Sequence, residues 1–464
     1  MEFLRVIKFY LVTLVFLLPG LTATAQGYIG LGLSNNVITD VFTNPAFVVN
    51  DDDFQINAIG ASGYVGNNAY YLKKGGISSV LNGVSNPFFM KSANKDTKVI
   101  YGNADFLGPA VSFKVKKKYY VAVSTRLRYL LNMDNLNNDA FRLMGGQPAD
   151  TSKVYNLNKF SFNNQLFAQL GVSYGGIITS NDENVLTGGV TLNYMMGFAA
   201  AGVTVPQSSF SVDRNNMLSN LTGRANVAFT PYANTWLSKG SPLAKFGSVP
   251  TGSGMGLDMG VVYEYNPIEG MSRQARGYLV RLSASITDIG SIKYTASTTT
   301  GSYSTNPNAT AYDIYSVNKD PNHTYGQAIN QLMTDSAVLQ KSKSGKFKMF
   351  LPTALHLGMD LKLGKMFYLN AASLINLRSP LTSVYGDHYV TSFTLAPRYE
   401  SKYFSFGLPF TVNSYKIANL GAVLYMGPFY IGSASIFSPA IGNNMNNFDI
   451  YAGVHFIFNK RKDY

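Results

Sequence analysis

The stretch that decides the fold is Met349-Phe-Leu-Pro-Thr-Ala-Leu-His-Leu-Gly-Met-Asp-Leu-Lys-Leu363. Its odd-numbered positions are apolar apart from Thr353, and its even-numbered positions include His356, Asp360 and Lys362. This alternation is typical of a strand, because a helix would place its apolar residues three and four positions apart. Strands of soluble proteins usually end after about five or six residues. The stretch therefore predicts a strand that crosses a bilayer, with lipid on its apolar face and water on the other.

Residues 1–25 have the pattern of a secretory signal peptide. Arg5 and Lys8 precede an apolar core from Phe9 to Leu21, and Ala23-Thr24-Ala25 form a small-residue cleavage site. The alternative is a membrane anchor, but the core is too short to span about 30 Å as a helix. No other stretch approaches the roughly 18 consecutive apolar residues of a helical span. With helical spans excluded, a closed barrel is the remaining structure that satisfies every backbone hydrogen-bonding group in hydrocarbon.

The composition agrees with a barrel. The chain has 31 tyrosines, 30 phenylalanines and 43 glycines in 464 residues, and only 14% of its residues are charged. These proportions suit strands with aromatic girdles and glycine-rich turns. The absence of cysteine excludes disulfides, thiolate zinc sites, cysteine nucleophiles and a lipoprotein anchor.

The net charge of +13 favours lipid rather than nucleic acid as a partner. The basic residues are dispersed along the predicted strands and turns of an exported chain, which disfavours nucleic-acid binding. Attraction to anionic head groups of outer-membrane lipid is the more natural use for them.

We predict an all-β fold, a transmembrane antiparallel β-barrel of fourteen strands. Counting the strand-like pieces Val203–Val212 and Ala225–Pro231 would instead give sixteen. The long connections should be external and the short turns periplasmic, which places both termini in the periplasm and the protein in the outer membrane. The fourteen strands are expected near residues 54–66, 99–115, 118–131, 160–178, 184–197, 255–265, 277–287, 349–363, 366–378, 387–400, 402–414, 417–426, 429–437 and 448–458. The long external loops are expected at 67–98, 132–159, 198–254 and 288–348, within a barrel domain of residues 54–464.

Residues 26–53, between the signal peptide and the first strand, do not have a spanning pattern. They are rich in glycine and asparagine, include Asn44-Pro45-Ala46, and end in the acidic run Asp51–Asp53. Asn-Pro favours a turn. We expect this segment to lie inside or under the barrel.

The inward-facing polar positions of the predicted strands are candidate lumen residues. His356 and Asp360 share a face but lie about 13 Å apart along an extended strand, so each must meet a partner on another strand. One reading is a wet lumen of ion pairs, and the other is a specific substrate site. The predicted lumen-lining residues are Arg126, Arg128, Arg281, His356, Asp360, Lys362 and His455.

No catalytic, metal-binding or cofactor motif accompanies these residues. The best enzymatic candidate is a hydrolase at the barrel rim that uses Asp387 and His388. Adjacent residues of a strand point to opposite faces, so these two cannot pair directly unless the strand ends before them. We predict that the protein is not an enzyme and binds neither metal nor cofactor.

Four prolines lie inside predicted strands: Pro109, Pro352, Pro397 and Pro409. Each removes a hydrogen-bond donor from the sheet, so each predicts a bulge or a gap in the wall. Pro397 and Pro409 lie on neighbouring strands joined at Ser401. Two hypotheses apply to this place: a lateral opening in the wall, or a bulge without a function.

Several motifs resemble known outer-membrane families. The Ala-Thr-Ala signal end, Asn44-Pro45-Ala46 ahead of the first strand, and fourteen strands with long early loops resemble the FadL-like long-chain fatty-acid transporter superfamily. Other motifs are similar to an uncharacterised Gram-negative outer-membrane barrel family. They are Leu351-Pro352-Thr353, Leu357-Gly358, Pro397-Arg398-Tyr399, Phe404-Ser405-Phe406-Gly407-Leu408-Pro409 and Met426-Gly427-Pro428-Phe429-Tyr430-Ile431-Gly432-Ser433.

The FadL-like resemblance implies that Asn44, Pro45 and Ala46 form a hatch, and that apolar cargo binds within the barrel and leaves through its wall. Some FadL-like barrels instead act as partners of secretion machinery. The first hypothesis is therefore passive transport of small hydrophobic or amphiphilic molecules, gated by the N-terminal segment. The alternative is a non-transporting partner of a secretion or assembly complex, which docks a protein through its external loops.

Overall fold

The structure is a computed structural model, and part of the chain is described in it. The predicted signal peptide 1–25 lies outside the described residues, as do 26–37 and 51–53 of the N-terminal segment. The described residues are 38–50, 54–73, 88–90, 97–116, 118–144, 149–213, 217–231, 249–267, 277–306, 312–313, 333, 335–336, 338–342, 345–379, 385–401, 404–441 and 444–458.

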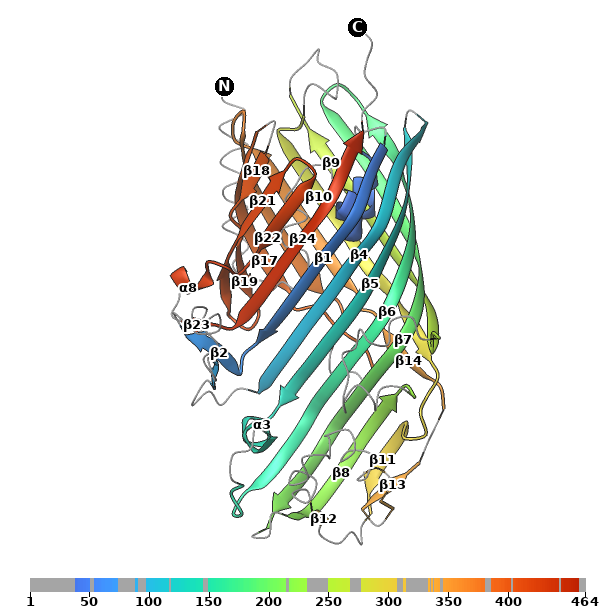
Figure 1. The fold of residues 1–464 in the computed structure, drawn as a ribbon, viewed down its shortest axis with the longest axis vertical. Helices are drawn as coiled ribbons and strands as arrows, with labels where there is room; N and C mark the ends of the chain where they lie inside the picture. The colour runs from blue at the N-terminus through green and yellow to red at the C-terminus, as the bar shows by residue number, and fades with distance from the viewer. Residues whose placement is uncertain are drawn as a thin grey trace.

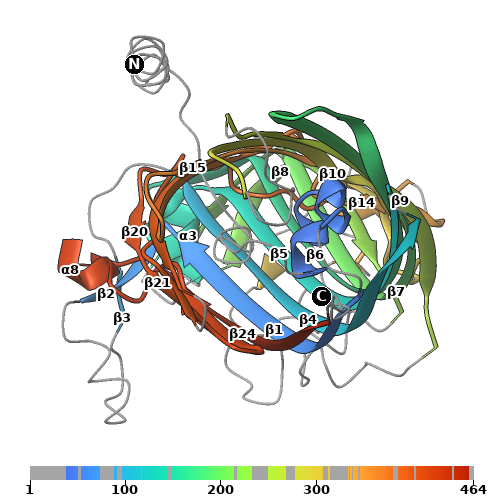
Figure 2. The same cartoon turned by 90° about the horizontal axis from the view of Figure 1, so that it is seen from above.

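Among these residues, fourteen wall positions form one closed antiparallel ring, which confirms the predicted barrel (Figures 1 and 2). The ring closes where the first strand pairs with the last, from Phe54 opposite Phe458 to Gly66 opposite Asn447. In order, the wall consists of β1 (Phe54–Asn67), β4 (Lys98–Lys116), β5 (Tyr119–Leu136), β6 (Val154–Ser180), β7 (Asn184–Val212), β9 (Gly252–Tyr265), β10 (Val280–Tyr294), β15 (Ala354–Lys362), β16 (Phe367–Asn376), β17 (Ser392–Glu400), β18 (Phe404–Gly407) continued by β19 (Phe410–Asn413), β21 (Ala422–Met426) preceded by β20 (Ala418–Leu420), β22 (Phe429–Ser433) and β24 (Asn447–Phe458).

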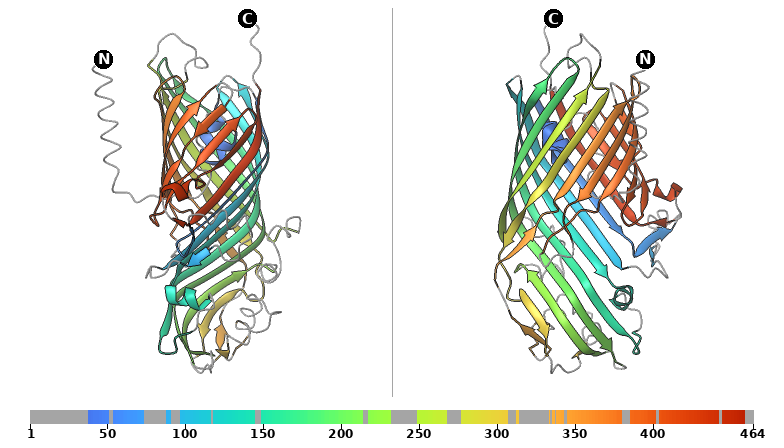
Figure 3. Two further views of the ribbon diagram at one scale, coloured as in Figure 1. Left: turned by 60° about the vertical axis from the view of Figure 1, so that its left-hand side comes forward. Right: turned by 180° about the vertical axis from the view of Figure 1, so that it is seen from behind.

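The two ends of the barrel differ. At one end, which we call the turn end, β1 begins, β24 ends and short connections such as 181–183 and 427–428 join neighbouring strands. At the other end, the loop end, the strands of one side of the wall extend well beyond the ring (Figure 3). The longest, β7, has 29 residues, whereas about 9–11 suffice to cross a bilayer.

The extension explains why the sixteen-strand alternative is wrong. The first half of β7 pairs with β9, from Asn184 opposite Tyr265 to Gly197 opposite Gly252. Its second half pairs with β8 (Met217–Phe229), which in turn pairs with β11 (Gly301–Thr305). Residues expected in the loops 198–254 and 288–348 therefore form a sheet beyond the ring, because β7 keeps its hydrogen bonds by changing partner.

Smaller elements accompany this extension and the rim. They are β2 (Tyr70–Lys73), β3 (Phe88–Met90), β12 (Tyr312–Asp313), β13 (Leu339–Lys341), β14 (Phe347–Phe350), β23 (Asn444–Met445) and the helices α3 (Asn138–Met144) and α8 (Ser438–Ile441). Among the described residues, no helix is both long enough and apolar enough to cross a membrane.

The stretch Met349–Leu363 is not one continuous strand. Residues 351–353 separate β14 from β15, and the face of the chain changes across this break. Leu357 is 42% exposed on the outer wall, but Met349 and Leu351 are buried at 0% and 1% in a cluster with Leu130, Phe167, Met195 and Ile292. The expectation that Met349 and Leu351 face lipid is therefore wrong. The physical reason is that an irregularity in the pairing shifts the period-two alternation by one residue, which exchanges the two faces.

The outer surface of the ring is apolar. On β5, inward residues such as Ser124, Arg126 and Arg128 are buried, and they alternate with outward residues. The exposed large apolar side chains of the wall include Phe106, Leu170, Leu192, Val261, Leu282, Leu357, Leu395, Phe406, Phe429, Ile450 and Phe456. A closed ring with an apolar outer band is a transmembrane β-barrel.

Replacing Leu357 by Arg should destabilise the barrel, because the guanidinium would face hydrocarbon near the middle of β15. We expect a loss of about 2–4 kcal/mol in the free energy of unfolding, measured by urea titration in lipid vesicles. Leu363→Arg is the matched control, since Leu363 is 66% exposed just beyond the turn end of β15. It should cost about 0–1 kcal/mol. Equal losses would contradict the assigned depth.

Candidate functional site

Residues 38–50 lie inside the barrel, towards the turn end (Figures 1 and 2). They form two short 3-10 helices, η2 (Ile38–Phe42) and η3 (Pro45–Val48). Asn44 caps η3, because its side-chain oxygen accepts a hydrogen bond of 2.9 Å from the backbone N–H of Ala46. Pro45 occupies the first helical position, where its fixed φ is favourable and its missing N–H costs nothing. The Asn-Pro-Ala motif thus makes a compact turn of its own.

A row of wall residues without side chains holds this turn. Gly175 on β6 lies opposite Gly189 on β7, Gly189 lies opposite Gly260 on β9, and Gly260 lies opposite Ser285 on β10. A Cβ atom at Gly189 would approach the carbonyl of Pro45, and one at Gly260 would approach the side chain of Asn44, both to less than 3.0 Å. We call Gly175, Gly189 and Gly260 the glycine trough. It exists because three adjacent strands present glycine at one level of the lumen.

Hydrogen bonds fix the turn in the trough. The Asn44 amide donates to the backbone carbonyls of Val261 at 3.2 Å and Ala284 at 3.4 Å. The Ser285 hydroxyl donates to the carbonyl of Thr43 at 2.5 Å. Asn44 thus serves both as the cap of η3 and as its link to the wall.

A second segment, residues 385–391, crosses the lumen nearer the loop end. Asn132 on β5 donates to the carbonyl of His388 and accepts from its N–H, both at 3.1 Å. The His388 ring lies 2.9 Å from the Asp134 carboxylate, and Gln165 donates to Asp387 at 2.6 Å. We call residues 385–391 the inward segment.

The inward segment corrects the strand predicted for 387–400, since β17 begins only at Ser392. Asp387 and His388 do not pair with each other, and each is buried against a different wall strand. The backbone of His388 bonds the side chain of Asn132, and the backbones of Tyr385 and Asp387 bond that of Phe350, which is why this stretch need not continue the ladder of β17.

An arginine layer lies between the two segments. Arg128 donates to both carboxylate oxygens of Asp288, at 2.6 and 3.0 Å, and to the hydroxyl of Tyr389 at 2.6 Å. Tyr389 in turn donates to Asp288 at 3.0 Å. Arg126, two residues along β5, lies 3.7 Å from Asp288, and its guanidinium stands over the ring of Phe42 at 4.7 Å. Asp288 is therefore linked to the inward segment directly and to the N-terminal segment through Arg126.

Asp288 reaches this position because of a bulge. The pairing of β10 with β9 shifts between Ile286 and Ile289. Asp288 has a φ of 59°, an uncommon conformation for a residue with a side chain. The bulge turns its carboxylate into the lumen, where its neighbours hold it.

A second ionic cluster lies nearer the turn end. Arg281 pairs with Glu264 at 2.8 Å, and Arg398 pairs with Asp360 at 2.8 Å. Tyr278 also donates to Asp360. This cluster joins β9, β10, β15 and β17 on the turn-end side of the glycine trough.

The remaining predicted lumen residues are dispersed. The ring of His356 lies 2.9 Å from the hydroxyl of Thr287, the ammonium of Lys362 stands 5.8 Å from the ring of Tyr368, and His455 lies beside Tyr430. Sequence reasoning missed Asp288, Tyr389 and Arg398 as parts of the ionic clusters. The alternation of its strand could have predicted that Arg398 faces the lumen. Asp288 lies in a bulge and Tyr389 in a segment that is not a strand, and alternation predicts nothing about the direction of either side chain.

The four prolines mark irregularities of the wall. The pairing of β4 with β5 shifts beside Pro109, and Pro352 lies in the break between β14 and β15. Leu408 and Pro409 separate β18 from β19, and the register on either side places Leu408 opposite Pro397 and Pro409 opposite Ala396. Leu408 donates to the carbonyl of Pro397 at 3.0 Å, and Gly421 donates to that of Pro409 at 2.9 Å. The described wall is thus hydrogen-bonded across these two prolines.

Residues 19–434 match a family of unknown function (DUF5723). The chain belongs to this family. No curated protein matches the chain.

Among solved structures, the chain is similar to the Ralstonia pickettii toluene transporter TbuX, with 12% identity, coverage of 96% of this chain and 100% of that one, and a TM-score of 0.40. It is also similar to the Pseudomonas putida toluene transporter TodX, with 9% identity, coverage of 93% of both chains and a TM-score of 0.32. A Pseudomonas aeruginosa FadL homologue shows 10% identity, coverage of 94% and 98%, and a TM-score of 0.30. The expected similarity to FadL-like barrels is therefore found.

Replacing Gly189 by Ala should displace the N-terminal segment, because a Cβ there meets backbone atoms of Pro45 and Ala46 that cannot rotate away. Since the chain has no cysteine, Ala46→Cys provides a unique thiol, and its rate of maleimide labelling reports exposure. A strain of about 1.4 kcal/mol would raise the exposed fraction about tenfold.

Gly63→Ala is the matched control, because a Cβ at Gly63 meets no atom within 4 Å. It should leave the labelling rate of the introduced thiol unchanged. If Gly189→Ala labelled no faster than this control, the trough would not hold the segment.

The inward segment should loosen as the pH rises. Burial raises the pKa of Asp387 to about 7, against a hydrogen bond from Gln165 and the nearby charge of His388 and Arg128. Burial alone would lower the pKa of His388, but the facing Asp134 raises it above its usual value. Both groups therefore bind protons more tightly in the folded state. Their stabilisation is complete below about pH 4 for Asp387 and about pH 6.5 for His388, and it is lost as the pH rises through the folded values.

Labelling of Val390→Cys, divided by that of the exposed Lys365→Cys, should increase between about pH 6 and about pH 8. The ratio removes the change in thiol ionisation. Adding Asp387→Asn should flatten the part of the increase that centres near pH 7, since the remaining charged groups around this position, His388, Arg128, Arg378 and Asp134, stay in place. A ratio independent of pH would contradict the assignment.

Proposed function

We propose that this protein is a passive conduit for small hydrophobic or amphiphilic molecules across the outer membrane. In this proposal the turn end and both termini face the periplasm. The N-terminal segment is the hatch, with Asn44, Pro45 and Ala46 as the part seated in the wall.

An apolar layer inside the loop end carries the proposal. A barrel that serves as an aqueous channel has a polar interior. Here the inward side chains of several wall strands form one buried apolar cluster next to the arginine layer, with Tyr385 of the inward segment packed against it. The cluster consists of Leu130, Phe167, Met195, Ala200, Ala228, Ile292, Tyr294, Phe347, Met349 and Leu351. In this proposal an apolar molecule leaves water by entering this layer, whose packing loosens to admit it.

The two lumen segments supply the closure. A molecule that moves from the apolar layer towards the turn end meets the inward segment first and the N-terminal segment second. Moving the inward segment would break the hydrogen bonds of Tyr389 to Arg128 and Asp288, and moving the N-terminal segment would break those that tie Asn44 and Thr43 to the wall. In this proposal the closed state is therefore the resting state, and passage requires both segments to move.

The alternative function is docking of a protein partner of a secretion or assembly complex. The extension of β7, β8, β11 and β13 beyond the ring favours it, because it presents a sheet outside the membrane. In this case the N-terminal segment would be a permanent plug, and its removal would not alter permeability.

Deleting residues 26–48 should increase the uptake of an apolar probe. Intact Gram-negative cells that express the barrel would be exposed to N-phenyl-naphthylamine, which fluoresces once it reaches phospholipid. We expect faster uptake in the deletion variant than in the parent, because the trough is then empty.

Gly189→Ala should increase uptake in the same direction without deleting any chain, and Gly63→Ala should match the parent. Protein levels in the outer membrane would be equalised by quantitative blotting. Parental uptake in a folded deletion variant would sink the hatch proposal and favour the docking function.

A further inference from the structure

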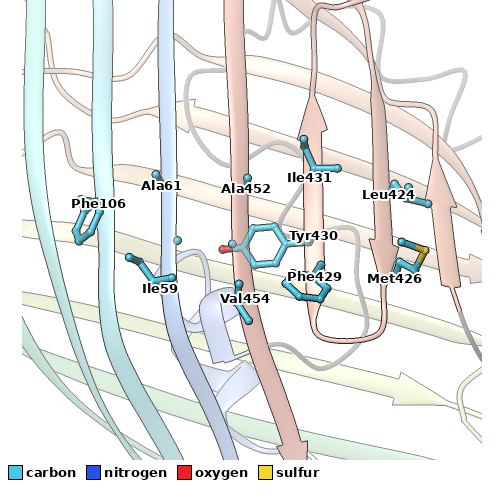
Figure 4. A pocket seen from close by; sticks show the side chains of 12 residues that line it. Ile59, Ala61, Phe106, Leu424, Met426, Phe429, Tyr430, Ile431, Ala452 and Val454 are labelled. Carbon is cyan, nitrogen blue, oxygen red and sulfur yellow. The ribbon is translucent and has the colours of Figure 1, made fainter.

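A groove with a volume of about 460 Å³ lies on the outer face of the wall, where β1 and β24 close the barrel (Figure 4). Its floor consists of Ala61 on β1 and Ala452 on β24, which lie directly opposite each other. Its sides are Phe106 on β4 and Ile431 on β22.

The pairing register creates this groove. Across five adjacent strands, one row of outward residues runs Phe106, Ala61, Ala452, Ile431 and Leu424. Two small residues thus stand between large ones, and both Phe106 and Ile431 are about half exposed, at 48% and 52%. The next outward row towards the turn end runs Ile59, Val454, Phe429 and Met426, and it closes the groove on that side.

Tyr430 supports the floor from within the barrel. It is 2% exposed and alternates with the outward residues Phe429 and Ile431, so its ring lies on the inner side of the wall, beside Gly453 and Gly60, which lie opposite each other. A Cβ atom at either glycine would come within 3.0 Å of the Tyr430 hydroxyl. Because these glycines have no side chains, the Tyr430 ring can approach the backbone of β1 and β24 from the inside. It thereby supports the floor of the groove.

The chemistry of the groove is almost entirely hydrocarbon. Tyr430 has the one polar side chain among its twelve lining residues, and its buried hydroxyl has no hydrogen-bond partner among the described residues. A water-soluble ligand would find no other polar group here. The groove lies within the apolar outer band, so the hydrocarbon of the bilayer is what surrounds it.

We propose that this groove binds one acyl chain of a membrane lipid as a resident ligand. The volume falls within the range of about 300–1,000 Å³ typical of small-molecule sites. Lipid tails are as apolar as the groove, so the hydrophobic effect does not favour binding. The gain comes from dispersion contacts with a preformed surface that flanks the chain on both sides. This proposal is independent of the conduit function.

Photocrosslinking tests the proposal with the full barrel in vesicles. The vesicles would consist of phosphatidylethanolamine with a small fraction that carries a diazirine in one acyl chain. We expect label on the peptides of β22 and β24 at several times the level on β16, whose outward residues do not line this groove. Ala452→Leu should reduce the label on β22 and β24 to the level of β16, because the new side chain fills the floor.

Ala371→Leu is the matched control, since Ala371 lies on β16 opposite Leu395, which is exposed on the outer wall. It should leave the label on β22 and β24 unchanged. Ala61→Leu fills the same floor from the other strand, and it serves if Ala452→Leu does not fold. Uniform labelling of the parent, or labelling that survives a folded floor variant, would overturn the proposal. Crosslinks between two copies of the chain at this face would also overturn it, in favour of a dimer contact.

Discussion

The buried ion pair between Arg128 and Asp288 is the interaction on which the interior of this barrel depends. Both side chains are removed from water, and an isolated charge there would be strongly destabilising. The pair persists because a second hydrogen bond joins the two side chains and because Tyr389 bonds both of them. One carboxylate thus ties the wall to the inward segment, and Arg126 extends the link to Phe42 of the N-terminal segment.

The glycine trough is the complementary constraint, since it supplies space where the arginine layer supplies attraction. Three glycines at one level of β6, β7 and β9 leave the wall without side chains, and the backbone turn of Asn44, Pro45 and Ala46 occupies that space. Hydrogen bonds hold the turn in this space, and Val41, Val48 and Val49 of the same segment pack in a buried cluster with Ala110, Tyr120 and Ala122 of the wall. The same device recurs at Gly60 and Gly453, where the absent side chains admit the ring of Tyr430.

These features divide the lumen into layers. An apolar layer at the loop end is followed by the inward segment, the arginine layer, the N-terminal segment and the cluster of Arg281, Asp360 and Arg398. Irregularities of the strands make the layers possible. The bulge at Asp288 aims a carboxylate inward, and the break beside Pro352 turns Met349 and Leu351 into the mouth of the barrel.

Local sequence patterns were enough to predict the barrel, because period-two alternation and turn residues do not depend on distant parts of the chain. They also determined the inward phase of Arg126, Arg128 and Asp360. Which charges meet depends on the folded barrel, since Asp288 lies 160 residues from Arg128 in the sequence and Tyr389 lies 261 residues from it. Pro352 predicts an irregularity at residues 351–353, but the change of face there was beyond the sequence, because one unpaired residue reverses the alternation and leaves the pattern on either side intact. The trough and the outer groove depend on register, which places residues of separate strands side by side, and no single stretch of the chain contains that information.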